Sequence, residues 1–566
     1  MKKIELLAPA GSFDALKAAI NAGADAVYFA GKDFGARKFA ANFDDEQIVE
    51  AIKYCKTHSV KSYITVNTLV TDREMKKLCP FLELIYTAGA DGVIVQDMGV
   101  AKIIREQIPQ LPLHGSTQMT VCTLDGAKQL EDLGYEQVVL SRELTKEQIE
   151  EICQNTNIKI EVFAHGALCV CYSGQCLMSS MIGGRSGNRG CCAQPCRMNY
   201  NLDGKEGAVL SLKDLSLIRH VDTLKEIGVD CLKIEGRMKG PEYISVVTSM
   251  YRKAIDGKEI TKEDITLLES IFYRGGYTDG YFTNNKTEDM YAPDKDENPY
   301  LKQKKYTMPP EKAANAKHQD RESVSIAAPV CKAKNRKGIA LSYRVRTAEQ
   351  LKAVLDTDYK TLYAPAGLIS KYASSLDLSK VVCTLPRLDM DKGLMHSIRS
   401  MGVEKAMASN IGQIGPLKDM GFKVIGDFTL NIYNTTALHM YKELGLWATC
   451  LSQELMLPQI RDIDKCMPTY ALAYGRLPLM YIENPPKGKS LTDRQGITFP
   501  IDGHEIFNSA PLYMADKISD MNEAGIREGI IMLTVEDGKQ TEEIIKAFYR
   551  KQPPKGKFTR GKYYKN

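Results

Sequence analysis

The feature that most constrains the fold of this 566-residue chain is a regular alternation, over residues 1–256, of short apolar runs with amphipathic stretches. The runs have the length and β-branched content of strands, whereas segments such as FDALKAAINAG and TKEQIEEICQN repeat apolar residues at helical spacing. Eight runs are predicted as strands: 4–10, 26–30, 62–67, 92–97, 112–116, 137–142, 159–165 and 231–236. Eight β–α units that close on themselves predict an α/β fold, a TIM-type (β/α)8 barrel.

Polar residues end most of the predicted strands, and barrels of this type carry their chemistry at the carboxyl ends of the strands. We expect the following side chains to ring one mouth: Asn67, Gln96, Asp97, His114, Ser116, Gln118, Ser141, Arg142, Glu143, His165, Lys233, Glu235 and Arg237. Arginine and lysine at such a mouth suit an anionic carboxylate or phosphate. The candidate catalytic residues are therefore His165, Arg142, Glu143, Lys233, Glu235 and His114. The alternative for these charged residues is a ring of salt bridges that stabilises the barrel rim.

The second half of the chain repeats the first at a nearly constant offset. The segment 114–152 resembles 425–463, and AHGALCVC from Ala164 resembles AYGRLPLM from Ala473, so that Tyr474 replaces His165 and Pro478 replaces Cys169. We predict a barrel over 1–256, an extension and linker over 257–322, and a degenerate barrel-like α/β repeat over 323–566. The repeat has lost the metal-type residues, which favours packing or substrate holding over a second active site. Two barrels within one chain favour a monomer.

Six of the fifteen cysteines lie within 28 residues, in the predicted cysteine loop 166–197. A cytosolic chain keeps its thiols reduced, which leaves metal binding or burial to explain them. The plausible ligands are Cys169, Cys176, Cys192 and Cys196, separated by six, fifteen and three residues. Structural zinc favours paired ligands two to four residues apart, and only the last pair fits, so the spacing favours an iron–sulfur cluster.

Other interpretations of these cysteines remain open. Cys171 and Cys191 can be buried thiols, and Cys231 on the last strand is a substitute ligand. His165, which ends the strand before Cys169, also admits a nucleophilic Cys–His pair. The spacing argues against that pair, because a catalytic thiol needs neither five neighbouring cysteines nor a glycine-rich loop, and no oxyanion-hole motif accompanies it.

The carboxyl-terminal segment YRKQPPKGKFTRGKYYKN interleaves seven basic residues with tyrosine and phenylalanine and contains no acid. This composition suits a phosphate backbone and stacked bases, and a solvated basic tail is the alternative. The start of the chain, MKKIELLAPAG, is too short for a signal-peptide core, and no stretch reaches the length of a membrane span. We therefore expect a cytoplasmic protein with no membrane partner.

The motifs EVFAHGALC, SGQC and NRGCCAQPCR, with KIEGR downstream, resemble the U32 peptidase-like (collagenase-like) family. LAPAG, GADAVYFAG, ITVNT, HGSTQMT and LSREL extend the resemblance over the first half of the chain, and the second half resembles the extra carboxyl-terminal region of longer members. The family includes hydroxylases of a tRNA wobble uridine or a 23S rRNA cytidine, with prephenate implicated, and ubiquinone-pathway hydroxylation proteins with a 4Fe-4S cluster. The resemblance implies a 4Fe-4S cluster on the four cysteines named above, with Cys191 and Cys231 as rivals to Cys196.

The sequence thus predicts an iron–sulfur enzyme that hydroxylates a base in structured RNA, tRNA or rRNA, with prephenate as a small anionic co-substrate. The basic side chains would orient that anion and the target base, which must be unstacked to reach a barrel mouth. The degenerate barrel and the basic tail would grip the RNA. One alternative is a U32-type peptidase, although no HExxH helix or serine triad is present. The other is a non-catalytic iron–sulfur scaffold that delivers RNA or a small molecule.

Overall fold

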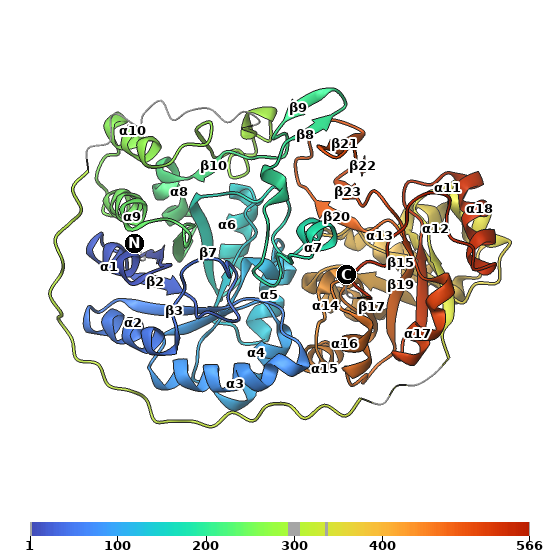
Figure 1. Cartoon of the computed structure of the whole chain (residues 1–566), viewed down its shortest axis with the longest axis horizontal. Helices are drawn as coiled ribbons and strands as arrows, with labels where there is room; N and C mark the ends of the chain where they lie inside the picture. The colour runs from blue at the N-terminus through green and yellow to red at the C-terminus, as the bar shows by residue number, and fades with distance from the viewer. Residues whose placement is uncertain (1–2, 293–305, 334, 336–337, 565–566) are drawn as a thin grey trace.

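The computed structural model describes residues 3–292, 306–333, 335 and 338–564. Two closed barrels of eight parallel strands lie side by side, each surrounded by helices, with the amino-terminal half on the left of Figure 1 and the carboxyl-terminal half on the right. The predicted fold, a TIM-type barrel followed by a second barrel-like α/β domain, is confirmed. Among the described residues, no helix is both long enough and apolar enough to cross a membrane.

The first barrel contains all eight predicted strands. They are β1 (Glu5–Pro9), β2 (Ala26–Phe29), β3 (Lys61–Val66), β4 (Gly92–Val95), β5 (Leu113–Gly115), β6 (Gln137–Val139), β7 (Lys159–Gly166) and β11 (Cys231–Ile234). The last strand, β11, pairs in parallel with both β7 and β1, which closes the barrel. The outer helices are α1 (Phe13–Asn21), α2 (Asp45–Thr57), α3 (Asp72–Thr87), α4 (Met98–Gln107), α5 (Leu124–Asp132), α6 (Lys146–Asn155), α8 (Val221–Glu226) and α9 (Pro241–Ile255).

Local sequence fixes where several of these helices begin. Asp44, Thr71 and Thr145 each accept a hydrogen bond from the backbone N–H three residues further on, and the side chain at that third position bonds back to the cap. These capping boxes satisfy backbone donors that a helix start otherwise leaves unpaired. The caps therefore fix the residue at which α2, α3 and α6 begin, and with it the length of the loop that joins each helix to the preceding strand at the barrel mouth.

The second barrel is a complete copy of the first. Its strands are β13 (Ala340–Arg344), β14 (Leu362–Pro365), β15 (Val381–Thr384), β16 (Lys405–Ala408), β17 (Lys423–Gly426), β18 (Leu446–Cys450), β19 (Thr469–Gly475) and β25 (Glu528–Met532). The helices are α11 (Ala348–Leu355), α12 (Ala366–Tyr372), α13 (Lys392–Ser400), α14 (Ile414–Asp419), α15 (Thr435–Glu443), α16 (Leu457–Asp462), α17 (Ile518–Glu523) and α18 (Gly538–Tyr549). The degeneracy predicted from the sequence therefore concerns the lost cysteines and not the barrel architecture.

The internal repeat also extends to details outside the barrel strands. A short antiparallel strand, β10 (Asp214–Ser216), pairs with the end of β7 beside His165, and β24 (Leu512–Tyr513) pairs with the end of β19 beside Tyr474. A 3-10 turn that ends on a left-handed residue follows β5 at Thr120 and β17 at Asn431. These matches support the sequence alignment of the two halves.

The two barrels share a third sheet. It is built from β8 (Tyr200–Leu202), β9 (Lys205–Gly207), β20 (Pro478–Tyr481), β21 (Ser490–Asp493), β22 (Thr498–Asp502) and β23 (Glu505–Phe507), in the order β20-β23-β22-β21-β8-β9. The strands β8 and β9 leave the first barrel after β7, and β20 to β23 leave the second barrel after β19. The antiparallel pairing of β21 with β8 joins the two excursions by backbone hydrogen bonds.

The barrels pack through equivalent helices, with α4 against α15 and α5 against the turn that precedes α14. At one contact, Asn434 at the start of α15 donates hydrogen bonds to the buried carboxylate of Asp97 at 2.8 and 2.9 Å. Gly99 and Gly412 lie at matching points, where a Cβ atom would stand 2.3 Å from Asn434 Oδ1 and 2.6 Å from Gly126 N, respectively. The interface is therefore pseudo-symmetric and as closely packed as a core.

The predicted extension and linker divide into two parts. Residues up to 292, with α10 (Lys262–Ile271) and β12 (Tyr277–Thr278), pack on the first barrel, where β12 pairs with β10. The segment 306–333 then runs around the outside of the first barrel, along the left and lower edges of Figure 1, and its backbone bonds to Thr57 and Thr87 at the ends of α2 and α3. Residues 293–305 lie outside the described part. The first strand of the second barrel begins at Ala340.

The basic carboxyl-terminal segment packs partly on the second barrel. Arg560 forms an ion pair with Asp516 at 2.6 Å, and Tyr563 is buried, with its hydroxyl donating to Leu472 O at 2.9 Å. Lys551, Lys555 and Lys557 are exposed. The predicted basic residue Lys565 lies outside the described residues. The exposed lysines can meet a partner, whereas the last tyrosines complete the fold.

Candidate functional site

The cysteine loop starts at the carboxyl end of β7 and crosses the mouth of the first barrel. Gly166 turns the chain with a φ of 107°, and a Cβ atom there would lie 2.6 Å from Glu235 O, so glycine alone fits without strain. The loop contains one short helix, α7 (Met178–Gly183). Gly190, further along, bonds to the backbone of Lys38, so the loop is attached to the β2–α2 connection.

The four predicted ligands surround a single cavity, which we call the first mouth cavity. It has a volume of about 140 Å³, and its lining includes Cys169, Cys176, Cys192 and Cys196, together with Cys171. Cys191 is not part of this lining, and its thiol donates instead to Arg189 O. Cys231 is buried in the barrel beneath the mouth. The structure therefore brings together the four cysteines that the spacing suggested.

The arrangement of the thiols bears on what they can hold. Among the described residues, no three His, Cys, Asp or Glu side chains are gathered closely enough for one metal ion. A zinc ion binds all its ligands at a single point, whereas the irons of a cluster bind their cysteines at separate corners. Four thiols that line one cavity are a soft donor set of the kind that an iron–sulfur cluster uses. Burial raises the pKa of Cys196 to about 12 and also raises that of Cys192, so these free thiols are protonated at neutral pH.

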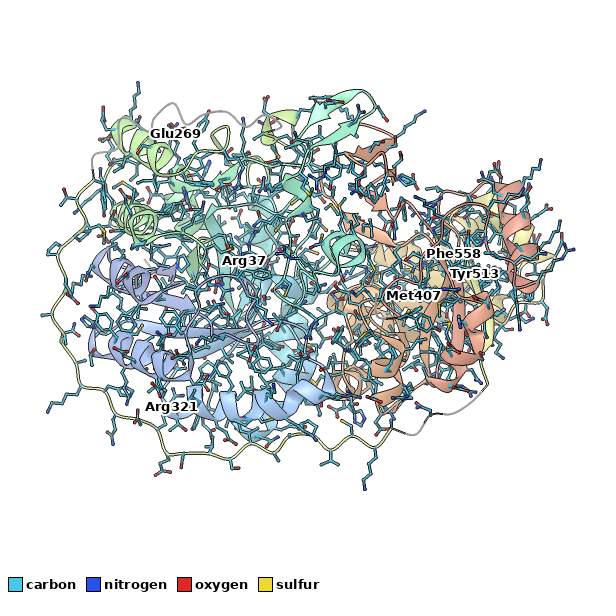
Figure 2. The ribbon with its side chains drawn as sticks, in the orientation of Figure 1. Arg37, Glu269, Arg321, Met407, Tyr513 and Phe558 are labelled. Atoms are coloured by element: carbon cyan, nitrogen blue, oxygen red, sulfur yellow. The ribbon has the colours of Figure 1, made fainter. Side chains whose placement is uncertain are left out.

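Basic side chains from three strand ends line the same cavity. Figure 2 labels one of them, Arg37, which follows β2 in the first barrel. Glu235 forms ion pairs with Arg37 at 3.2 Å and Arg142 at 3.7 Å. Burial alone would raise the pKa of Glu235, but Arg37, Arg142 and Arg237 more than offset it, so its pKa lies below the usual value. Burial lowers the pKa of Arg237 to about 10, and this guanidinium remains charged at neutral pH.

A second buried pair lies deeper in the same mouth. Lys233 on β11 forms an ion pair with Glu161 on β7 at 2.7 Å, and its ammonium lies 4.5 Å from the ring centre of Tyr28. Arg142 stacks over Phe163 with its guanidinium carbon 3.9 Å from the ring centre. Four cations thus face the carboxylates of Glu235 and Glu161. They are Lys233, Arg142, Arg37 and Arg237. The mouth therefore carries excess positive charge, which suits an anionic ligand.

Three of the six predicted catalytic residues do not line this cavity. His165 turns away from the mouth and packs on Tyr251 and Tyr277 at ring-centre distances of 5.6 and 5.0 Å. The pairing of β7 with β11 shifts register just before His165, and this irregularity is the physical reason, because one extra residue reverses the face of a side chain. Burial lowers the pKa of His165 to about 3, so the ring is neutral.

His114 and Glu143 are also buried away from the mouth. His114 lies within the barrel against Tyr63, at 4.5 Å between ring centres, and burial lowers its pKa to about 3. Glu143 follows β6 and is buried towards the second barrel, where burial raises its pKa to about 7. The structure brings Arg142, Lys233 and Glu235 to the cavity, as the sequence predicted. His114, Glu143 and His165 lie away from it.

Asn67, after β3, lines the cavity as expected, but sequence reasoning missed other polar side chains there. Among them, Arg37 lies in the loop after β2, and Tyr28 and Asn188 come from β2 and the cysteine loop. The alternation of side chains along a strand could have identified Tyr28, because it shares the inward face of AVYFA. No local pattern marks Arg37, whose φ of 72° reflects the turn that directs it to Glu235.

The second barrel supports the back of the cysteine loop. Asn188 donates to Glu454 at 2.9 Å, and the backbone N–H of Tyr481 donates to Cys171 Sγ at 3.3 Å. Gln175 donates to Thr429 O at 3.3 Å. Glu454 is the counterpart of Glu143 in the internal repeat. The loop after β18 of the second barrel, which corresponds to the loop after β6 of the first, therefore contacts the cysteine loop.

Fold and site together define a class: double (β/α)8-barrel proteins in which the first barrel carries a basic mouth lined with cysteines. Residues 11–291 match the pattern of the Peptidase family U32. The chain belongs to this family. The same part of the chain contains seven of the eight strands of the first barrel, all except β1, and the cysteine loop.

Three curated relatives are similar to this chain. The "tRNA hydroxylation protein P1" of Bacillus subtilis (strain 168) is 38% identical over 45% of this chain and 64% of that protein. The "23S rRNA 5-hydroxycytidine C2501 synthase" of Escherichia coli (strain K12) is 39% identical over 51% of this chain and 47% of that protein. The "Collagenase" of Porphyromonas gingivalis is 33% identical over 50% of this chain and 74% of that protein. The chain thus spans about half to two thirds of the length of the first two relatives.

Proposed function

We propose that this protein hydroxylates a base in structured RNA, either a tRNA uridine or a 23S rRNA cytidine, at the mouth of the first barrel. The observation that supports it most is the single cavity in which Cys169, Cys176, Cys192 and Cys196 meet Arg37, Arg142 and Arg237. Two relatives named for RNA hydroxylation are similar to about half of this chain, and the family match over residues 11–291 includes all of the residues that line this cavity except Met480.

In this proposal the four cysteines hold a 4Fe-4S cluster, which supplies electron transfer when it is bound. The chain's own residues do the rest. Arg37, Arg142 and Arg237 bind a small anionic co-substrate, with prephenate as the candidate, because their guanidinium groups match a carboxylate. Glu235 orients two of these arginines by its ion pairs.

The RNA base reaches the mouth only after it leaves its stack, because the cavity is enclosed by the cysteine loop and the strand ends. Tyr28 and Phe163 offer aromatic faces near the cations of the mouth. The exposed lysines of the carboxyl-terminal segment contribute charge for the phosphate backbone. RNA as the partner, a monomeric state and a cytoplasmic location are parts of the same proposal.

The test measures the metal content of the protein and the modified nucleosides of the RNA. The full-length protein is purified without oxygen and its iron and sulfide are measured, and nucleosides of tRNA and rRNA from a deletion strain are compared by mass spectrometry. We expect iron and sulfide in the protein and the loss of one hydroxylated nucleoside. Wild type should restore that nucleoside, and Arg142→Met should not, whereas the control Arg105→Met, on the outside of α4, should restore it.

The relative named "Collagenase" favours peptidase activity as the second candidate. An iron-free protein that degrades gelatin, together with unchanged nucleosides in the deletion strain, would overturn the hydroxylase proposal in favour of the peptidase. Iron and sulfide with unchanged nucleosides would instead favour the iron–sulfur scaffold.

A further inference from the structure

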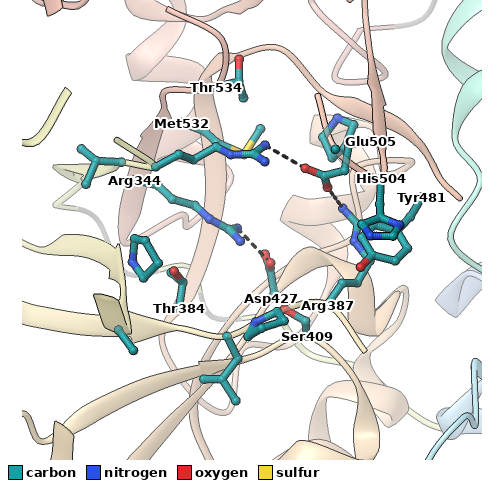
Figure 3. A pocket seen from close by; sticks show the side chains of 18 of the residues that line it. Arg344, Thr384, Arg387, Ser409, Asp427, Tyr481, His504, Glu505, Met532 and Thr534 are labelled. Carbon is teal, nitrogen blue, oxygen red and sulfur yellow. Dashed lines mark hydrogen bonds and ion pairs between the residues drawn. The ribbon is translucent and has the colours of Figure 1, made fainter. Parts of the chain in front are cut away.

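The mouth of the second barrel contains a larger cavity than that of the first, with a volume of about 540 Å³ (Figure 3). Strand ends of the second barrel form its floor, since Arg344 ends β13, Thr384 ends β15, and Asp427 follows β17. The turn between β22 and β23, with His504, forms part of the wall. This is the position at which (β/α)8 barrels bind their ligands, and the volume lies in the usual range for a small-molecule site.

Three guanidinium groups converge in this second mouth cavity. Arg344 pairs with Asp427 at 2.8 Å, while Arg346 and Arg387 both pair with Glu505, at 2.8 and 2.6 Å (Figure 3). Burial would raise the pKa of Glu505, but Arg387, Arg346 and Arg344 together lower it below its usual value. Inside the cavity, three cations thus face the carboxylates of Asp427 and Glu505. Two further acids of the lining are exposed: Asp391, and Asp502, whose side chain is 54% exposed.

These charges are costly for a mouth that serves packing alone. The side chains of Arg387 and Arg344 are only 9% and 20% exposed. Apolar side chains fill such a space at lower cost than buried ion pairs, because desolvation of charges offsets much of their attraction. Among the described residues, the guanidinium of Arg344 has Asp427 as its hydrogen-bond partner, which leaves further N–H donors facing the cavity. The carboxylates therefore hold the guanidinium groups in position for an acceptor that a ligand supplies.

The remainder of the lining is apolar. Leu385, Met395, Phe428, Phe507 and Met532 line the same space as the arginines. Phe507 also lies under Arg346, at 5.3 Å between the guanidinium carbon and the ring centre. A site with convergent cations and an apolar wall selects a molecule that has an anionic head and an apolar body.

We propose that the second barrel binds a small organic anion, with a carboxylate or phosphate head held by Arg344, Arg346 and Arg387 and an apolar body against the methionine and phenylalanine side chains. The site is separate from the first mouth cavity. Strand β20 lies between them, with Met480 lining the first cavity and Tyr481 lining the second. It is also connected to the cysteine loop, because Arg387 lies 3.4 Å from Gln175 Oε1. The site does not depend on the reaction proposed for the first barrel.

Methionine side chains allow the two cavities to be observed separately. In the full-length protein labelled with ¹³C at the methionine methyl groups, Met395 and Met532 report on the second cavity and Met480 on the first. Their signals are assigned by single methionine-to-leucine substitutions. The probes are phenylacetate and phenyl phosphate as anions and benzyl alcohol as the uncharged control.

We expect at least one anion to shift the Met395 and Met532 signals in a saturable way, and benzyl alcohol not to do so. A stronger response to phenyl phosphate assigns the head to phosphate, and a stronger response to phenylacetate assigns it to carboxylate. The double variant Arg344→Met/Asp427→Asn removes both partners of one ion pair, which avoids an unpaired buried charge, and should weaken binding about tenfold or more. Arg387→Met should also weaken it, and the control Arg399→Met, outside the cavity, should not.

Three results would overturn this inference. They are the absence of any saturable shift of Met395 and Met532 with either anion, an equal response to benzyl alcohol, and wild-type affinity in the double variant. Shifts confined to Met480 would assign anion binding to the first barrel alone and would equally exclude the second site.

Discussion

At the scale of single residues, the site depends on how a few side chains fix one another. Glu235 pairs with two arginines, and Glu161 pairs with Lys233. The Glu161–Lys233 pair is buried, whereas Glu235 is partly buried. Such pairs add little stability, but they fix the direction of the cations, since breaking one leaves an uncompensated buried charge. The four thiols line the same cavity as Glu235 and the cations. Their role is therefore to be tested by replacing them one at a time.

We predict that replacement of any one of Cys169, Cys176, Cys192 or Cys196 by serine lowers the iron bound by the anaerobically purified protein well below about four atoms per chain. Cys191→Ser and Cys231→Ala, outside the cavity, should retain the wild-type amount. Iron and sulfide analysis measures both. Retention of iron by Cys196→Ser together with its loss in Cys191→Ser would assign the fourth ligand to Cys191.

A second residue-scale prediction concerns pH. Arg189 of the cysteine loop pairs with Glu74 on α3 at 2.5 Å. Burial alone would raise the pKa of Glu74, but Arg189 and Thr71 lower it from 4.5 to about 2. Because the folded-state pKa is the lower one, the pair stabilises the protein above pH 4.5, and this contribution is lost as the pH falls from 4.5 towards 2.

Glu74→Gln should therefore lower the free energy of unfolding by about 1 kcal/mol at pH 7, since both side chains are about a third exposed, and by clearly less at pH 3.5. Thermal unfolding at the two pH values measures the difference, and Glu50→Gln, on the exposed face of α2, is the matched control. A destabilisation that is equal at both pH values would contradict the assignment.

At the scale of elements, the mouth depends on contacts that cross between the two barrels. The cysteine loop belongs to the first barrel, yet Glu454 after β18 and Tyr481 on β20 hold it from the second. The pairing of β8 with β21 fixes the far end of the same excursion. The loop is thereby ordered by elements more than 260 residues away in the chain, as for Asn188 and Glu454, which are 266 positions apart.

We predict that Glu454→Ala loosens the part of the cysteine loop around Asn188. The loss of one buried hydrogen bond to a charged group corresponds to about 1–3 kcal/mol, so hydrogen exchange of the peptide 186–192 should become at least about tenfold faster. Glu454→Gln, which keeps an acceptor oxygen, should restore most of the protection, and Glu523→Ala on α17 is the control. Unchanged exchange in Glu454→Ala would show that the loop is held by the first barrel alone.

At the scale of the whole molecule, duplication has produced two barrels with different mouths. The mouth of the first barrel is lined with thiols and cations, and the mouth of the second with three arginines, four acids and apolar side chains. Their interface is pseudo-symmetric, with Gly99 and Gly412 in matching positions. We expect the two barrels to unfold together, because buried groups such as Asp97 have partners on both sides of this interface.

Gly99→Ala should therefore destabilise the whole protein. Its Cβ would lie 2.3 Å from Asn434 Oδ1 and 2.8 Å from Ala437 N, so α4 and α15 must move apart, at a cost of about 1–3 kcal/mol. Gly367→Ala in α12, where no atom lies within 4 Å of the added Cβ, is the matched control and should be neutral. Calorimetry should show one transition at a lower midpoint for Gly99→Ala. An unshifted midpoint would contradict the close packing of the interface.

The sequence predicted the fold well, because strand length, helical periodicity and caps are local properties. All eight strands of the first barrel and the grouping of four cysteines follow from patterns within a few tens of residues, and the internal repeat follows from comparing the two halves of the sequence. Arg142, Lys233 and Glu235 could be assigned to the mouth because they end strands. Arg37 could not, because its position depends on a turn whose direction is set by Glu235 and the cysteine loop.

By itself, then, the sequence determined that the chain forms barrels and which loop carries the thiols. Tertiary structure alone decided which polar side chains reach the cavity. A register shift beside Ala164 turns His165 away, and His114 and Glu143 are buried outside the cavity. It also decided that the second barrel has a charged mouth of its own and supports the cysteine loop of the first. The physical reason is that strand and helix formation depends on neighbouring residues, whereas the face and partner of a polar side chain depend on how separate elements pack together.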